Sequence, residues 1–160
     1  MVYIVRIRTD VCGGEYSSAG GCMTQGETLN GGPLVMLVED FRDTREVMRH
    51  MLEMQGCRVV EASNGQEAIE LSQRRRLDLV LMDLNMPVLD GFNATLRIRE
   101  YEPTRDVPVV AVTAFDSAES RAAAGAVGCC DYVVKPLDLD NLSTLLRRLL
   151  PSRADAKSEV

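Results

Sequence analysis

The chain has 160 residues, 46% hydrophobic and 26% charged, enough for one domain of ordinary size with a hydrophobic core but not for two. No apolar run is long enough to span a bilayer. The formal net charge of -6 argues against non-specific binding of nucleic acid, which requires clustered Lys and Arg. Five cysteines without C-x-x-C spacing fit a reducing compartment better than a disulfide framework or a zinc site. The first residues make a poor secretory signal, so we expect a cytoplasmic protein.

Residues 1–32 differ in composition and hydrophobic periodicity from the rest of the chain. They contain three Gly-Gly pairs among Ser, Thr and Asn, with little hydrophobic periodicity, which predicts a flexible leader. Periodic apolar patterns begin at Pro33 and continue to Leu150. We therefore expect a single domain over residues 33–150 and a flexible polar tail over residues 151–160.

Within this domain, apolar runs alternate with stretches of helical spacing. Strands are predicted at 34–38, 57–62, 78–83, 107–112 and 131–134, and helices at 42–55, from 65, at 92–101, at 118–127 and from 139 to Pro151. Asn64 is a predicted helix cap with Glu67 reaching back, and Asp116 is the predicted cap of the fourth helix. Strands rich in Val, Leu and Ile that alternate with helices predict an α/β fold, a doubly wound parallel sheet with helices on both faces.

Polar side chains follow four of the predicted strands. These side chains belong to Glu39 and Asp40, Asp83, Thr113, and Lys135. In open parallel sheets the site lies beyond the carboxyl ends of the strands, so we expect these residues to converge there.

The chemistry of this set points to a metal-dependent phosphoryl site. The only histidine, His50, falls within the first helix, which excludes a histidine-dependent nucleophilic site. Three neighbouring carboxylates repel one another unless a cation is present, and hard oxygen ligands favour Mg²⁺. Asp83, at the end of a buried strand, is the candidate nucleophile. Lys135 could pair with a phosphoryl oxygen and Thr113 could hydrogen-bond another.

The motifs that carry these residues resemble those of response regulator receiver domains. The matching motifs are Glu39-Asp40, D-L-N-M-P-V-L-D-G at 83–91, Thr113-Ala114 and Y-V-V-K-P at 132–136. The resemblance implies a five-stranded flavodoxin-like sheet in the order 2-1-3-4-5. It also implies that Asp83 accepts a phosphoryl group from a histidine kinase or histidine phosphotransfer protein, that the Asn85 carbonyl joins the carboxylates in binding Mg²⁺, and that Thr113 and Tyr132 form a switch.

A stand-alone, chemotaxis-regulator-like receiver would signal through a protein target or pass the phosphoryl group onward. The resemblance therefore predicts a signalling protein and not an enzyme. With the charge and hydropathy above, we expect no direct nucleic-acid contact and no membrane insertion. A homodimer through the fourth helix, fifth strand and fifth helix is one further expectation.

Two other classes share parts of this pattern. An aspartyl-phosphate phosphohydrolase normally needs a second aspartate two residues after the nucleophile, where this chain has Asn85. A nucleotide- or flavin-binding domain needs a glycine-rich loop after the first strand, where this chain has E-D-F-R-D. Tyr132 and Thr113 could also be a half-buried strand aromatic and a loop hydroxyl with no switching role.

Overall fold

The computed structural model describes residues 31–150, in which five strands alternate with five α-helices. The elements are β1 (Leu34–Val38), α1 (Arg42–Met54), β2 (Arg58–Ala62), α2 (Gly65–Arg74), β3 (Leu79–Asp83), α3 (Gly91–Glu100), η2 (Glu102–Thr104), β4 (Val109–Thr113), α4 (Ala118–Ala126), β5 (Asp131–Val134) and α5 (Leu139–Leu149). The predicted alternation is confirmed. The main difference in the strands is β4, which begins at Val109 and includes Thr113 as its last residue.

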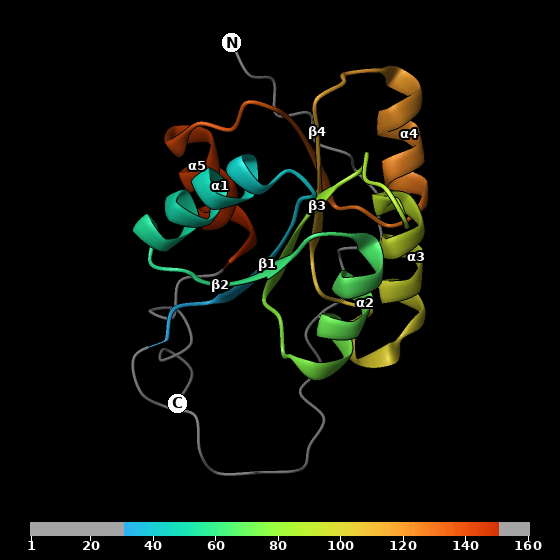
Figure 1. Ribbon diagram of the computed structural model, residues 1–160, viewed down its shortest axis with the longest axis horizontal. Coiled ribbons are helices and arrows are strands. Elements are labelled where there is room, and N and C mark those ends of the chain that lie inside the picture. The colour runs from blue at the N-terminus through green and yellow to red at the C-terminus, as the bar shows by residue number, and fades with distance from the viewer. Residues whose placement is uncertain (1–30, 151–160) are drawn as a thin grey trace.

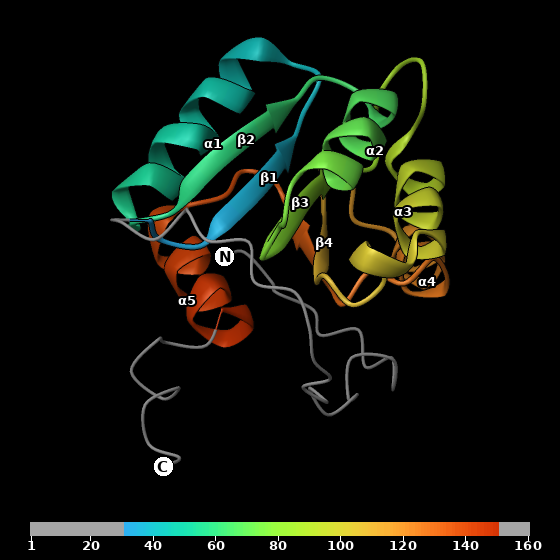
Figure 2. The same cartoon turned by 90° about the horizontal axis from the view of Figure 1, so that it is seen from below.

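All strand pairs in the sheet are parallel, in the order β2-β1-β3-β4-β5. Helices α1 and α5 cover one face of the sheet, and α2, α3 and α4 cover the other (Figures 1 and 2). The sheet is therefore doubly wound, and the winding reverses between β1 and β3, as predicted.

The core is divided by the sheet into two layers. Along β1, Val35 and Leu37 belong to the layer under α1 and α5, whereas Met36 and Val38 belong to the opposite layer. This alternation follows from the two-residue period of a strand. Because both faces of the central strands are covered, all five residues of β3 are buried, and the last of them is Asp83.

The N-terminal cap of α2 is as predicted, whereas that of α4 is a different residue from the predicted one. Asn64 caps α2 by accepting from the Glu67 amide, and the Glu67 carboxylate accepts from the Ser63 amide and hydroxyl. These hydrogen bonds, led by the one from the Ser63 amide, lower the pKa of Glu67. The predicted cap of α4 was wrong: Ser117 is the cap residue, and Asp116 pairs with Arg121 instead.

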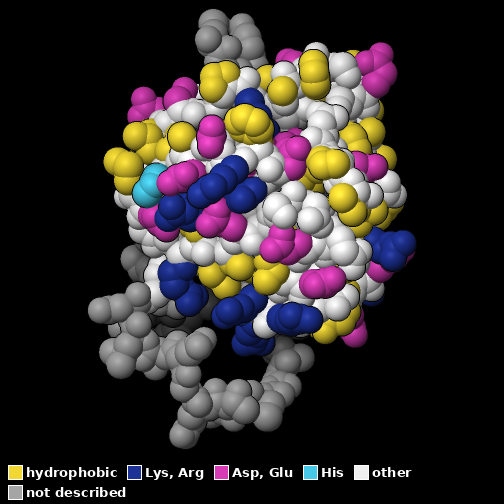
Figure 3. Space-filling model, viewed as in Figure 1, with side chains coloured by type: hydrophobic (Ala, Val, Ile, Leu, Met, Phe, Trp, Pro, Cys, Tyr) yellow, Lys and Arg dark blue, Asp and Glu magenta, His cyan; other side chains and the backbone are white. Residues whose placement is uncertain are grey.

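Charged side chains of both signs are interspersed on the face seen in Figure 3. No helix within residues 31–150 combines the length and hydropathy that a membrane crossing requires. The predictions for residues 1–30 of the leader and for the tail at 151–160 lie outside the described residues. Gly32, the last predicted leader residue, lies against the domain, where its carbonyl accepts a hydrogen bond from Arg58 Nε at 3.0 Å.

Candidate functional site

The carboxyl ends of β1, β3 and β5 bring together three carboxylates and one ammonium group. Glu39, Asp40 and Asp83 each offer an oxygen atom, and these oxygens all lie within 4.8 Å of one another. Lys135 Nζ lies 2.5 Å from Glu39 Oε2 and 3.0 Å from Asp83 Oδ2. The convergence predicted for Glu39, Asp40, Asp83 and Lys135 is thus present in the structure.

The two carboxylates that contact Lys135 are almost removed from solvent. Glu39 is 2% exposed and Asp83 is 4% exposed, whereas Asp40 lies on the surface. Burial raises the pKa of Glu39 above its ordinary value of 4.5, although Lys135 lowers it. Desolvation therefore destabilises the ionised form of Glu39, and a further positive charge close to the carboxylate would stabilise that form.

Lys135 supplies the positive charge that this structure offers to the acidic groups. Burial alone would lower the pKa of Lys135, but hydrogen bonds to Glu39 and Asp83 outweigh burial and raise it. The ammonium group is therefore charged at neutral pH and shared between two carboxylates. The peptide bond that joins Lys135 to Pro136 is cis.

Asp83 is held at the sheet edge by the turn that follows it. Its Oδ1 accepts a hydrogen bond from the Asn85 amide at 2.9 Å. The Gly91 amide donates to the Leu84 carbonyl, and a Cβ atom at residue 91 would lie 2.1 Å from the Asp83 carbonyl oxygen. Only glycine permits this approach of the start of α3 to the end of β3, while Asp90 caps α3 through the Asn93 amide.

Thr113, the remaining residue of the predicted set, joins the cluster through Asn85. The Asn85 side-chain amide donates to Thr113 Oγ1 at 3.1 Å, so a chain of hydrogen bonds links Asp83, Asn85 and Thr113. Thr113 Oγ1 also accepts from the Phe115 amide, and the Tyr132 hydroxyl donates to the Phe115 carbonyl at 2.7 Å. Tyr132 is fully buried, which contradicts the half-buried alternative.

One residue beside the site was missed in the sequence. Arg45, in the second turn of α1, donates from Nη1 to the Glu39 carbonyl at 2.8 Å. A basic residue on the helix that follows an acidic strand end was the available signal, but surface arginines on helices are common. Its partner on β2, Glu61, is distant in sequence and could not be assigned from spacing.

The fold and the carboxyl-edge cluster define a flavodoxin-like α/β protein with an acidic site. The family model described as "Response regulator receiver domain" matches residues 35–147, and the chain belongs to this family. It is accordingly a two-component signalling domain of the kind that accepts a phosphoryl group, and neither the phosphohydrolase nor the flavin-binding alternative is favoured.

Curated relatives of the chain differ in length. The chain is 33% identical over 118 residues to the polar-differentiation response regulator DivK of Brucella anthropi, covering 72% of this chain and 94% of DivK. Other curated regulatory proteins are longer, and the chain spans 25% to 51% of their length. Similarity to these longer proteins concerns the receiver portion alone.

Solved structures extend the comparison to the site. The receiver domain of the sensor histidine kinase PA1611 of Pseudomonas aeruginosa, described with a magnesium ion in its active site cleft, is 37% identical, with a TM-score of 0.72 over 76% of this chain and all (100%) of that chain. The Ssk1 receiver domain of Saccharomyces cerevisiae, solved with the phosphotransfer protein Ypd1, is 30% identical, with a TM-score of 0.69 over 76% of this chain and 91% of that chain.

Proposed function

We propose that Asp83 is the phosphoacceptor of this receiver and that Glu39, Asp40, Asp83 and the Asn85 carbonyl bind Mg²⁺ beside it. The observation that carries the proposal is the sharing of the Lys135 ammonium between the nearly buried carboxylates of Glu39 and Asp83. This arrangement leaves an acidic site whose negative charge exceeds the single positive charge within it.

The donor set suits Mg²⁺. The ligand atoms are carboxylate and carbonyl oxygens, which hard divalent cations prefer, and no sulfur or imidazole ligand accompanies them in the described part of the chain. Asp40 is exposed, so water can complete the coordination. When bound, Mg²⁺ would neutralise the carboxylates and the oxygens of an incoming phosphoryl group.

In the proposed reaction, an Asp83 carboxylate oxygen attacks the phosphorus atom of a phosphohistidine. A phosphorus–oxygen bond forms to Asp83 as the phosphorus–nitrogen bond to the donor imidazole breaks, and the imidazole nitrogen keeps the electron pair. The Lys135 Nζ atom lies 3.0 Å from Asp83 Oδ2 before any phosphoryl group is present. Its ammonium group can therefore move from the carboxylates to a phosphoryl oxygen, and the Thr113 hydroxyl can bind another.

The proposed donors are a histidine kinase or a histidine phosphotransfer protein. The Ssk1 receiver, a structural neighbour of this chain, was solved in complex with such a phosphotransfer protein. The output is a phosphorylation-dependent contact with a protein target or onward transfer of the phosphoryl group. A homodimer through α4, β5 and α5 remains a prediction. Leu142, Leu145 and Leu146 of α5 are buried in the core and are not available to a partner, whereas Leu139 is 38% exposed.

The output switch is proposed to run from Thr113 to Tyr132 through the Phe115 backbone. Thr113 accepts from the Phe115 amide, and Tyr132 donates to the Phe115 carbonyl. A phosphoryl group on Asp83 that recruits the Thr113 hydroxyl would therefore pull on the loop that also anchors Tyr132. Couplings of this kind are typically ~1 to 3 kcal/mol, so the active conformation is expected to be populated before phosphorylation.

Labelling with acetyl phosphate tests the proposed site. Wild-type protein should be labelled in Mg²⁺ and not in EDTA, and Asp83→Asn should abolish labelling. Asp90→Asn is the matched control, because it changes an aspartate of the same loop that caps α3 and lies outside the acidic cluster. Labelling of Asp83→Asn at the wild-type level, or undiminished labelling in EDTA, would contradict the proposal.

A further inference from the structure

The backbone of Glu39 continues the sheet by one residue beyond β1. The Glu39 amide donates to the Ala62 carbonyl at 3.0 Å, after the last registered pair of β1 and β2, Val38 with Ala62. The carbonyl of Glu39 then lies past the regular pairing of these two strands. Its direction determines where the Glu39 and Asp40 side chains leave the backbone, so its hydrogen-bond partner matters for the acidic site.

Arg45 is that partner. Its Nη1 donates to the Glu39 carbonyl at 2.8 Å and lies 3.5 Å from the Asp40 carbonyl. The Arg45 side chain is 19% exposed. A guanidinium group that donates to the peptide between the two acidic residues restrains the turn on which both are mounted.

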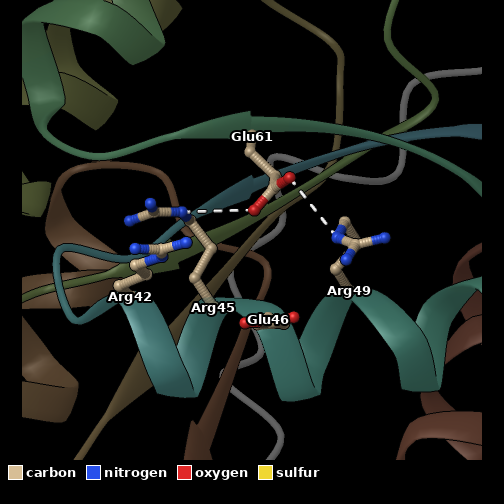
Figure 4. A pocket seen from close by; sticks show the side chains of 5 residues that line it. All are labelled: Arg42, Arg45, Glu46, Arg49 and Glu61. Atoms are coloured by element: carbon tan, nitrogen blue, oxygen red, sulfur yellow. Dashed lines mark hydrogen bonds and ion pairs between the residues drawn. The ribbon is translucent and has the colours of Figure 1, made fainter.

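Glu61 of β2 holds the guanidinium group in this position. Arg45 Nε lies 3.2 Å from Glu61 Oε1, and Arg49 Nε lies 3.4 Å from Glu61 Oε2 (Figure 4). These residues, with Arg42 and Glu46, line a surface hollow of 260 Å³. In Figure 3 basic and acidic side chains lie intermixed beside the single histidine.

We propose that Arg45 is a positioning residue for the metal site: it fixes the Glu39 and Asp40 backbone through the Glu39 carbonyl, with Glu61 orienting the guanidinium. This inference rests on the proposed function, since it concerns the carboxylates assigned there to Mg²⁺. Arg45 has no hydrogen bond to the carboxylate oxygens of Glu39, Asp40 or Asp83. It acts through the peptide backbone of the residues that carry those oxygens.

Two effects of removing Arg45 oppose each other. Loss of a positive charge near the site would favour a bound cation, whereas loss of the backbone restraint would weaken its binding. Arg49 separates these effects, because it belongs to the same Glu61 network but has no hydrogen bond to the acidic turn. Arg49→Gln removes the same charge and keeps the restraint.

The test compares wild type, Arg45→Gln, Arg45→Lys and Arg49→Gln by Mg²⁺ titration followed by NMR chemical shifts. Arg45→Gln should weaken the apparent Mg²⁺ affinity about tenfold relative to Arg49→Gln, at the low end of effects for outer-sphere partners of metal ligands. Arg45→Lys should fall between, since one ammonium cannot serve both Glu61 and the Glu39 carbonyl as a guanidinium does.

A second measurement needs no metal. Amide hydrogen exchange in EDTA should be faster at Phe41 in Arg45→Gln than in Arg49→Gln, because the Phe41 amide donates to Glu39 Oε1 at 3.2 Å and reports the geometry of the turn. If Arg45→Gln does not fold, Arg45→Lys and Arg49→Lys provide the same comparison.

Equal Mg²⁺ affinity and equal Phe41 exchange in the Arg45 and Arg49 variants would overturn the inference, even if Arg45→Gln were less stable. This result would leave the proposed function intact, since wild type would still bind Mg²⁺. A wild-type protein that binds no Mg²⁺ would instead contradict the metal site itself, and the inference with it.

Discussion

Replacement of Lys135 by Met should produce opposite effects on stability and on metal affinity. The Lys135 side chain is 20% exposed and pairs with two carboxylates whose side chains are 2% and 6% exposed. Removing one member of a fully buried ion pair costs about 3 to 5 kcal/mol. Because Lys135 is partly exposed and Glu39 can take up a proton, we expect a loss of roughly 2 kcal/mol in EDTA, or roughly 8 °C in Tm for a domain of this size.

Magnesium should reverse most of this loss. The ion would occupy the acidic site without competition from the ammonium, and an advantage of about 1.4 kcal/mol would tighten Mg²⁺ binding about tenfold. The folded-state pKa of Lys135 is raised above its ordinary value of 10.5, so its contribution to stability is complete below that value and is lost only as pH rises through the folded pKa. The free energy of unfolding measured at neutral pH therefore includes the whole contribution of the Lys135 charge.

The assay is thermal unfolding followed by circular dichroism, in EDTA and in saturating Mg²⁺, with Arg49→Met as the control for loss of a partly exposed, ion-paired basic side chain outside the acidic site. Labelling by acetyl phosphate should be lost in Lys135→Met although Mg²⁺ binds more tightly. A Lys135→Met protein as stable as wild type in EDTA, or one that Mg²⁺ stabilises no more than wild type, would contradict the proposed role of the Lys135 ammonium.

Three other substitutions and one truncation test separate features of the domain. Gly91→Ala should lower the free energy of unfolding by about 3 kcal/mol in urea denaturation, because its Cβ would overlap the Asp83 carbonyl; wild-type stability would refute this packing argument. Glu39→Gln should match wild type in EDTA below the ordinary Glu pKa and exceed it as pH rises through the raised pKa of Glu39, since ionisation then costs the wild type stability; parallel pH–stability curves would contradict this. Phe115, 69% exposed beside Thr113, should obstruct a hydrolytic water, so Phe115→Ala should shorten the aspartyl-phosphate lifetime, and equal or slower decay would count against that role. A chain that begins at Gly32 should unfold cooperatively and be labelled normally, whereas precipitation would make the leader part of the fold.

The fold could be predicted because its strongest signals are local. Most strand residues are Val, Leu or other apolar residues. A strand buried on both faces, such as Leu79–Asp83, is apolar up to its last residue and is therefore easily recognised in the sequence. Helix details were less certain, because local signals compete. Asp116 and Ser117 are both good caps, and the Asp116 pair with Arg121 leaves Ser117 to accept from the Ser120 amide. Val47 is an apolar residue of α1 but is 59% exposed, so apolar character in a helix does not by itself place a side chain in the core.

The convergence of Glu39, Asp40, Asp83 and Lys135 could also be predicted, because polar residues at the ends of parallel strands share an edge of the sheet. Their pairing could not, since it depends on distances across the fold. Lys135 and Glu39 are 96 residues apart in sequence and 2.5 Å apart in space. The Asn85 link to Thr113 and the Arg45 contact with the Glu39 carbonyl depend on side-chain directions that spacing does not determine.

The position of the phosphoryl group after transfer from a phosphorylated histidine kinase shows directly whether Asp83 is the phosphoacceptor. The acyl phosphate can be reduced with borohydride, which converts a phosphorylated aspartate to homoserine, and the altered residue can then be located by peptide mass spectrometry. We expect modification at Asp83 in Mg²⁺ and none in EDTA. Modification at another aspartate, or none with any kinase that phosphorylates a control receiver, would contradict this expectation.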